Sequence, residues 1–390
     1  MRAVHLATRL VKQADHRIAR LFGKARVLID VRTPMNLAVL GPVWTSLARD
    51  PRVRLTFTAH EADAVAEALG PEHRRQLVAP ARARWRRFDL AVTADFWSNT
   101  PARRCRRRIN FFHGVAGKYD LDRPDRLAAA DLGRFDRLAF VNDERRQRYV
   151  QAGVVAPERA LLVGFPKLDD LVNGRWVPAD VRRELGLDPS LGTVLYAPTF
   201  STANSLQAHG EGLIAALLAA GRNVIVKLHD RTLVPSTQYT GGVDWPARLA
   251  AFAANPRFAL ARGADASPYL SAADVLVTDH STVGFEFALL DRPIVAVDAP
   301  ALRQAARIDQ GKWDLLRSMA TVVDSTASLT ASLTTAVERA FAEPERGRDA
   351  RARARDLFAY PGAATERALA AVYELLDLEP LPAYEVLRRH

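Results

Sequence analysis

The sequence predicts an α/β protein that contains two doubly wound parallel sheets. Its 390 residues exceed what one ordinary hydrophobic core holds and suit two domains of about 150 to 200 residues each. Short apolar runs alternate with segments of helical periodicity in both halves of the chain, as in parallel sheets covered by helices. Residues 273–300 contain a complete strand–turn–helix–strand unit.

The amino-terminal half alternates in this way from residue 26 onward. Helices are expected at 37–48 and 60–69, where apolar residues recur at helical spacing. Buried strands are expected at 26–31, 53–58, 88–93, 109–112, 138–142 and 161–165. Because no Gly-x-Gly-x-x-Gly follows the first of these strands, the sequence does not predict dinucleotide binding of the dehydrogenase kind.

The carboxyl-terminal half begins after residues 173–190, whose glycines and prolines predict a connection between domains. Strands are then expected at 193–197, 223–228, 258–261, 275–277 and 294–297, and helices at 212–220, 283–290 and 363–376. The polar stretch 201–212 is expected to be a loop over the active site, and 310–316 a mobile loop.

The turn 278–282, Thr-Asp-His-Ser-Thr, leaves the carboxyl end of a strand and enters the amino end of a helix. Unpaired backbone N–H groups at such a place favour an anion, and Ser281 and Thr282 add two hydroxyl donors. A diphosphate needs this kind of cradle. The same two residues are also ordinary helix caps, so capping alone is the alternative interpretation.

Two histidines also follow predicted strands. His113 comes directly after 109–112 and precedes Gly114, where it could act as a general base near neutral pH or only hydrogen-bond its loop. Lys227 and His229 end the strand 223–228, at the same sheet edge as the turn 278–282. A lysine and a histidine there can neutralise charge on a departing nucleotide.

The segment 278–295, TDHSTVGFEFALLDRPIV, resembles the signature of the CDP-glycerol glycerophosphotransferases, the teichoic-acid primase and polymerase enzymes. Four more segments agree with that family in the right order, so that the resemblance spans about residues 111 to 375. They are 113–114, 195–200, 226–229 and 362–367.

The resemblance implies a GT-B fold, in which two Rossmann-like domains face a cleft. It places an acceptor-side domain at 1–172, a linker at 173–190 and a nucleotide-donor domain at 191–345. Residues 346–390 are expected to form helices that cross back to the first domain.

The implied reaction is the transfer of glycerol or ribitol phosphate from a CDP-activated donor to a hydroxyl of a glycan or polymer, free or lipid-linked, with release of CMP. The residues that match the family motifs are expected to divide the work: catalysis by His113 and His229; donor diphosphate binding by Ser281, Thr282, Lys227 and Gly114; nucleotide binding by Thr199, Asp279 and Glu286; acceptor binding by Lys118 and Asp120. Glu286 could instead be a salt-bridged helix residue, and Lys118 a solvated one.

The chain departs from the family at two motifs. Phe-His-Gly-Val-Ala replaces the usual Trp-His-Gly-Thr-Pro around His113, and Asp230 replaces the proline that usually follows the histidine corresponding to His229. The alternatives are a GT-B glycosyltransferase that uses a nucleotide sugar, a nucleotide-sugar epimerase, and a non-catalytic anion-binding protein.

The composition indicates which classes of partner the protein could bind. The net charge of +11 implies an anionic partner, and arginines cluster at 82–87, 103–108 and 145–148. No nucleic-acid-binding motif accompanies them, so the sequence does not favour nucleic acid as the partner, whereas an anionic membrane surface or merely solvated faces fit better. The basic stretch 4–22 could form a lipid-contacting helix or one packed on its domain.

The remaining features predict a cytoplasmic protein, either free or on the inner face of the membrane. No apolar run reaches the roughly 18 residues of a membrane span, and the amino terminus lacks the apolar block of a secretory signal. The single cysteine, Cys105, permits no intrachain disulfide. No metal-binding motif occurs, and neither a metal nor a cofactor is expected.

Overall fold

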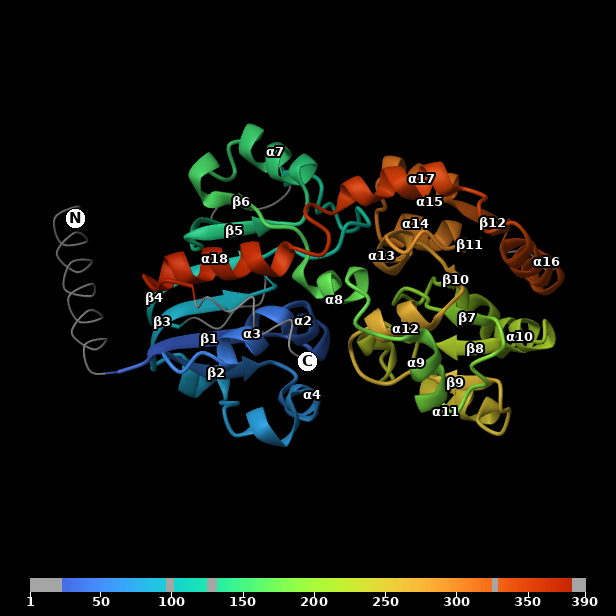
Figure 1. The fold of residues 1–390 in the computed structure, drawn as a ribbon, viewed down its shortest axis with the longest axis horizontal. Helices are drawn as coiled ribbons and strands as arrows, with labels where there is room; N and C mark the ends of the chain where they lie inside the picture. The colour runs from blue at the N-terminus through green and yellow to red at the C-terminus, as the bar shows by residue number, and fades with distance from the viewer. Residues whose placement is uncertain (1–22, 96–101, 125–131, 325–328, 381–390) are drawn as a thin grey trace. The chain divides into compact units, whose positions relative to one another are not determined.

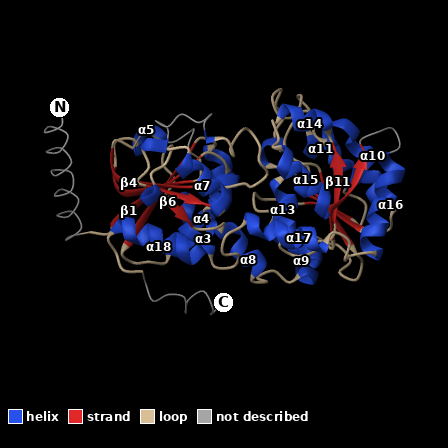
Figure 2. Ribbon diagram, turned by 90° about the horizontal axis from the view of Figure 1, so that it is seen from above, coloured by secondary structure: helices blue, strands red, loops and turns tan. Residues whose placement is uncertain are grey.

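The computed structural model describes residues 23–95, 102–124, 132–324 and 329–380. It contains two six-stranded sheets in which every strand pair is parallel (Figure 1). Helices lie on both sides of the strands of each sheet (Figure 2). The α/β class with two doubly wound parallel sheets is therefore confirmed. The helix expected within 4–22 lies outside the described residues.

The first compact unit comprises Met1–His113, Leu127–Lys167 and Ala363–His390. Its sheet has the order β2-β1-β3-β4-β5-β6. The strands are β1 Ala25–Val31, β2 Val53–Ala59, β3 Arg87–Thr93, β4 Arg104–Phe111, β5 Arg137–Phe140 and β6 Ala160–Leu162. The α-helices are α2 Pro34–Val39, α3 Gly41–Ala48, α4 Ala62–Arg74, α5 Pro80–Ala83, α7 Asp143–Gln151 and α18 Ala364–Leu376.

Two elements of this unit differ from expectation. The helix predicted at 37–48 is two helices, because Gly41-Pro42 opens α3 and a proline cannot continue the backbone ladder of α2. Strand β4 starts at Arg104, well before the predicted 109–112. The extension pairs with β3, where Arg104 lies opposite Arg87. Asp136 holds its middle, because it accepts from the guanidinium of Arg107 at 2.8 Å and from the backbone of Arg108 at 2.8 Å.

The second unit comprises Gly114–Arg126 and Leu168–Gly362, and its sheet has the order β12-β11-β10-β7-β8-β9. The strands are β7 Thr193–Tyr196, β8 Asn223–Val226, β9 Phe258–Leu260, β10 Val275–Thr278, β11 Ile294–Asp298 and β12 Ala320–Asp324. The α-helices are α8 Asp169–Val172, α9 Pro178–Glu184, α10 Ser205–Ala219, α11 Trp245–Leu249, α12 Ser267–Ala272, α13 Thr282–Ala288, α14 Pro300–Ala305, α15 Gln310–Met319, α16 Leu329–Ala342 and α17 Arg348–Ala354.

Both loops predicted in this half contain helix. Helix α10 begins inside the expected loop 201–212, because the side chain of Asn204 accepts from the backbone of Gln207 and caps it. The expected mobile loop 310–316 lies within α15, whose Trp313 and Leu316 are buried. The polar residues that suggested loops include the cap Asn204 and side chains that the helices bury, such as Ser205 and Lys312.

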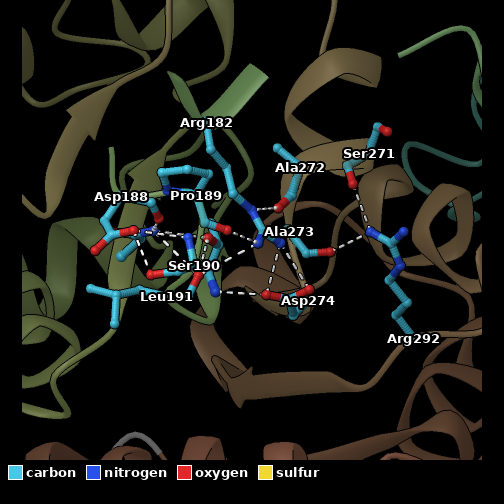
Figure 3. Close-up of polar contacts among 12 residues, drawn as sticks. Arg182, Asp188, Pro189, Ser190, Leu191, Ser271, Ala272, Ala273, Asp274 and Arg292 are labelled. Atoms are coloured by element: carbon cyan, nitrogen blue, oxygen red, sulfur yellow. Dashed lines mark hydrogen bonds and ion pairs between the residues drawn. The ribbon is translucent and has the colours of Figure 1, made fainter. Parts of the chain in front are cut away.

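A charged network closes the amino-terminal edge of the second sheet, before β7 and β10 begin (Figure 3). Arg182 of α9 donates to both carboxylate oxygens of Asp274, at 2.9 and 2.8 Å, and to the carbonyl of Ala272 at 2.9 Å. Asp274 also accepts from the backbone of Thr193 at 2.8 Å. Arg292 donates to the carbonyls of Ser271 and Ala273. These bonds join α9, α12 and two strands at the edge opposite the predicted site.

No helix in the described part of the chain is long and apolar enough to cross a membrane. The stretch 173–190, which we expected to connect the domains, contains α9 and groups with the second unit. Helix α18 groups with the first unit, where Tyr373 donates to the carboxylate of Asp50 at 2.9 Å.

Candidate functional site

The carboxyl ends of β7, β8 and β10 lie at one edge of the second sheet, because these strands are adjacent and parallel. Most of the predicted site residues follow these three strands. Thr199 comes after β7, Lys227 and His229 after β8, and the turn 279–282 after β10. The strand topology therefore brings together side chains that are up to 83 positions apart in the sequence, from Thr199 to Thr282.

Ser281 is the N-cap of α13, and its hydroxyl accepts from the backbone N–H of Val283 at 3.4 Å. Ser281 therefore caps α13. The bond is long and does not prevent the hydroxyl from binding a ligand as well. Thr282 is half-buried and makes no side-chain hydrogen bond with the described residues. A Cβ added to Gly114 would lie 3.5 Å from Thr282 Oγ1, so the backbone of Gly114 runs past this hydroxyl.

The segment that starts at Gly114 is held by the second unit. The ring nitrogen Nε2 of His280 donates to the carbonyl of Ala116 at 2.7 Å. Gly117 has φ +61°, and a Cβ there would come within 2.7 Å of Lys312 Cγ. Glycine is therefore required at this position on both conformational and steric grounds.

Two residues further on, the same segment turns with left-handed backbone. Tyr119 and Asp120 have φ values of 55° and 59°. The backbone N–H of Tyr119 donates to the carbonyl of Ala306 at 2.9 Å, and Arg307 Nε donates to the carboxylate of Asp120 at 2.8 Å. Residues 114–126 therefore group with the second unit, whereas the resemblance predicts them to lie in the first domain.

Asp279 organises the interior of the site. It is fully buried and accepts from the backbone of Thr199 at 2.8 Å and from the backbone and hydroxyl of Ser205 at 3.1 and 3.0 Å. The ammonium group of Lys118 donates a hydrogen bond to Thr199 Oγ1. Burial raises the pKa of Asp279 and lowers the pKa of Lys118 to about 8, and each charge partly offsets the effect on the other. Lys118 thus belongs to the hydrogen-bond network that connects Thr199 to Asp279 of the turn 278–282.

His229 follows β8 at the same edge, and its side chain is 25% exposed. Its Nδ1 is 2.5 Å from a carboxylate oxygen of Asp230, and the ring of Phe200 packs on it with a centroid distance of 4.4 Å. The guanidinium of Arg231 lies over Phe200, 4.8 Å from the ring centroid. Lys227 is buried and donates to the carbonyl of Leu228 at 2.7 Å. Burial lowers the pKa of His229, while Asp230 opposes that shift.

His113 belongs to the first unit and follows β4. It is half-buried and hydrogen-bonded to the backbone of Ala94. Enclosure by protein lowers its pKa to about 4, against a smaller opposite effect of Asp95. The imidazole is therefore neutral around pH 7 and can accept a proton there.

The other predicted nucleotide ligand, Glu286, is 3% exposed and lies within α13. Several residues of the site had no predicted role: Tyr119, Phe200, Ser205, Asp230, Arg231 and His280. Three of them carried a signal: Phe200 and His280 lie in segments that resemble the family motifs, and Asp230 is a departure from one of those motifs. Among the described residues, no group of three or more His, Cys, Asp and Glu side chains could hold a metal ion.

Several solved structures share this fold. The wall teichoic acid polymerase TagF superposes in one structure with a TM-score of 0.63 at 14% identity, covering 98% of this chain and 99% of that one. A TagF variant soaked with CDPG gives 0.60 at 15%, covering 96% of each chain. The Staphylococcus aureus MnaA–UDP structure gives 0.60 at 10%, covering 91% of this chain and 98% of that one. At these identities the likeness concerns the fold alone. No curated protein matches the sequence.

The profile of one protein family matches the chain itself. It is described as CDP-glycerol:poly(glycerophosphate) glycerophosphotransferase, and it matches residues 92–360. This range contains the turn 278–282, both strand-end histidines and the segment after Gly114. The chain therefore belongs to the CDP-glycerol:poly(glycerophosphate) glycerophosphotransferase family and is a transferase.

Proposed function

We propose that this transferase moves a polyol phosphate, glycerol or ribitol phosphate, from a CDP-activated donor to a hydroxyl of a glycan or polymer and releases CMP. The observation that carries the proposal is the turn 278–282, which lies inside the family match and presents the Thr282 hydroxyl beside the Gly114 backbone. The soak of TagF with CDPG supports the choice of donor.

In the proposed step, His113 takes the proton of the acceptor hydroxyl. The acceptor oxygen bonds to the β-phosphorus, and the bond from that phosphorus to the oxygen of the α-phosphate breaks, so that CMP leaves with the electron pair. Ser281, Thr282, His229 and Lys227 hold the diphosphate and offset the charge on the departing phosphate. Gly114 lets the diphosphate approach the backbone, Thr199, Asp279 and Glu286 hold the nucleotide, and Lys118 and Asp120 support the acceptor side.

A donor screen tests this proposal. Purified protein is offered CDP-glycerol, CDP-ribitol, CMP-sugars and UDP-sugars with an acceptor polymer, and the released nucleotide is measured. We expect CMP release from a CDP-polyol, with radiolabelled polyol and its phosphate both appearing in the product. A product that gains a sugar without phosphate would identify a glycosyltransferase, and conversion of a UDP-sugar without an acceptor would identify an epimerase.

The Ser281→Ala/Thr282→Ala double variant should weaken binding of a CDP-activated donor by about 2 to 4 kcal/mol, since two hydrogen bonds to a charged diphosphate are lost. Cytidine binding should stay the same. Asp244→Ala is the matched control, because Asp244 caps α11 through the backbone of Ala247 at 3.0 Å. Calorimetric titration measures both ligands. If the double variant lowers only the melting temperature, as the control should, the two hydroxyls are caps alone.

We further propose that an anionic membrane surface binds the first unit at a group of residues that we call the arginine–tryptophan surface: Arg82, Arg84, Trp85, Arg86, Arg103 and Arg104. Trp85 is 59% exposed, and the guanidinium groups of Arg84 and Arg103 lie over its ring at 5.5 and 4.8 Å. None of the five arginines pairs with a carboxylate among the described residues. An exposed indole beside several guanidinium groups suits the headgroup region of an anionic bilayer.

The protein should therefore sediment with vesicles of phosphatidylglycerol and phosphatidylcholine but not with phosphatidylcholine alone, and salt should release it. Trp85→Ala/Arg103→Ala/Arg104→Ala should abolish most binding, at about 1 kcal/mol for each arginine. Arg183→Ala is the control, because Arg183 is exposed but paired with Asp180. Unchanged binding of the triple variant would refute this surface, and binding of RNA but not vesicles would identify a nucleic-acid partner.

A further inference from the structure

We propose that Asp230 is a positioning residue for the transfer: it fixes the tautomer of His229 and lets that histidine meet the donor as an imidazolium. The inference rests on the proposed function, in which His229 contacts the donor diphosphate. It concerns a position at which the chain departs from the proline of its family, so that the family motif does not account for it.

The contacts around Asp230 define where the protons are. The backbone N–H of Arg231 donates to Asp230 Oδ1 at 2.8 Å and is 3.2 Å from His229 Nδ1. The same carboxylate oxygen is 2.5 Å from that Nδ1. An ionised carboxylate has no proton to donate, so the short contact requires a proton on Nδ1. Asp230 Oδ1 then accepts from both His229 Nδ1 and the backbone N–H of Arg231. Because a protonated Nδ1 cannot accept, the N–H of Arg231 bonds to Asp230 and not to His229.

This assignment leaves Nε2 as the nitrogen of His229 that is available to a ligand. The Asp230 side chain is 8% exposed, whereas that of His229 is 25% exposed, so the ring is the more accessible of the two groups. Phe200 packs on the ring at 4.4 Å and is itself covered by the Arg231 guanidinium at 4.8 Å. The ring is therefore held on one side by a tilted aromatic contact and along one edge by a carboxylate.

The consequence for the reaction follows from counting protons. With the proton on Nδ1, a neutral His229 presents only a lone pair at Nε2, which repels a phosphate oxygen. A second proton, taken from water, converts Nε2 into a charged donor to the departing phosphate. Burial, Lys227 and Arg231 disfavour that imidazolium, while Asp230 favours it. The bound diphosphate supplies the remaining favourable charge, so donor binding should be coupled to proton uptake at His229.

This coupling is measurable with CDP itself, without turnover. The heat of CDP binding near pH 7.5 is compared in buffers of different ionisation enthalpy. We expect the wild type to take up part of a proton. Asp230→Asn and Asp230→Pro should abolish most of this uptake. Proline restores the family residue and is tolerated at the first position of the short 3-10 helix Asp230–Thr232. Asp188→Asn is the control, because Asp188 is a hydrogen-bonded acid of the same unit far along the chain.

Imidazole nitrogen spectra of the ligand-free protein test the tautomer, with His229→Gln to assign the signals. We expect Nδ1–H in the wild type and a mixture of tautomers in Asp230→Asn. We also expect kcat for CMP release to fall about 10- to 100-fold in both Asp230 variants, because one charge-assisted hydrogen bond is lost. The KM for the acceptor should change little.

An Nε2–H tautomer in the wild type, or proton uptake that survives in both variants, would overturn the positioning role. Unchanged kcat in the variants would do the same. Failure of the proposed function is distinguishable, because the wild type would then release no CMP from any CDP-polyol while the tautomer and the proton uptake with CDP could still be as expected.

Discussion

We expect His113→Ala to lower the turnover of polyol-phosphate transfer by roughly 10² to 10⁴, the usual contribution of a general base. Donor affinity should stay close to that of the wild type, because the residues that we propose to hold the diphosphate belong to the second unit and His113 to the first. Single-turnover CMP release and calorimetric titration of the donor measure the two quantities separately.

The pH dependence of turnover provides an independent check. Burial lowers the pKa of His113 to about 4, from an ordinary value near 6.5. A base with a lowered pKa is active above that pKa and lost below it, so the acid limb of kcat/KM should fall near pH 4 rather than near 6.5. This limb should disappear in His113→Ala.

The control is His60→Ala, since His60 is an exposed histidine of the same unit. It should leave turnover unchanged. Full activity of His113→Ala with an unchanged acid limb would show that another group is the base. Asp120 would be the next residue to replace, although Arg307 binds its carboxylate at 2.8 Å.

The second large effect concerns stability. Asp274→Ala should lower the free energy of unfolding by about 2 to 4 kcal/mol, because Nη2 of the buried Arg182 and the N–H of Thr193 lose their acceptor. A fully buried pair would cost more, but the Asp274 side chain is 39% exposed. Urea unfolding followed by circular dichroism measures the change.

Two further variants separate the ion pair from a general effect of charge. Adding Arg182→Met to Asp274→Ala should recover part of the loss, since the uncompensated guanidinium is gone. Asp180→Ala on the same helix α9 should change stability by less than about 1 kcal/mol, because its pair with Arg183 is exposed. Equal losses in Asp274→Ala and Asp180→Ala would show that the network in Figure 3 is not a special source of stability.

Several elements could be predicted because neighbours along the chain encode them. The runs 26–31 and 275–277 are short, apolar and β-branched, and they form β1 and β10. Capping chemistry is also local, but its outcome depends on which polar residue finds a backbone partner. Asn204 lies in a stretch that the sequence predicts to be a loop, although its side chain caps α10.

The sequence by itself determined the α/β class, the strand ends that carry His113, His229 and Ser281, and membership of a phosphotransferase family. Periodicity and contiguous motifs are sufficient for these, since each depends on residues a few positions apart. Only the tertiary structure decided which polar groups meet. Lys118 reaches Thr199 across 81 positions, and His280 reaches Ala116 across 164. Such partners are selected by the need to satisfy buried donors and acceptors after the strands have been ordered into a sheet, and no local pattern records that choice.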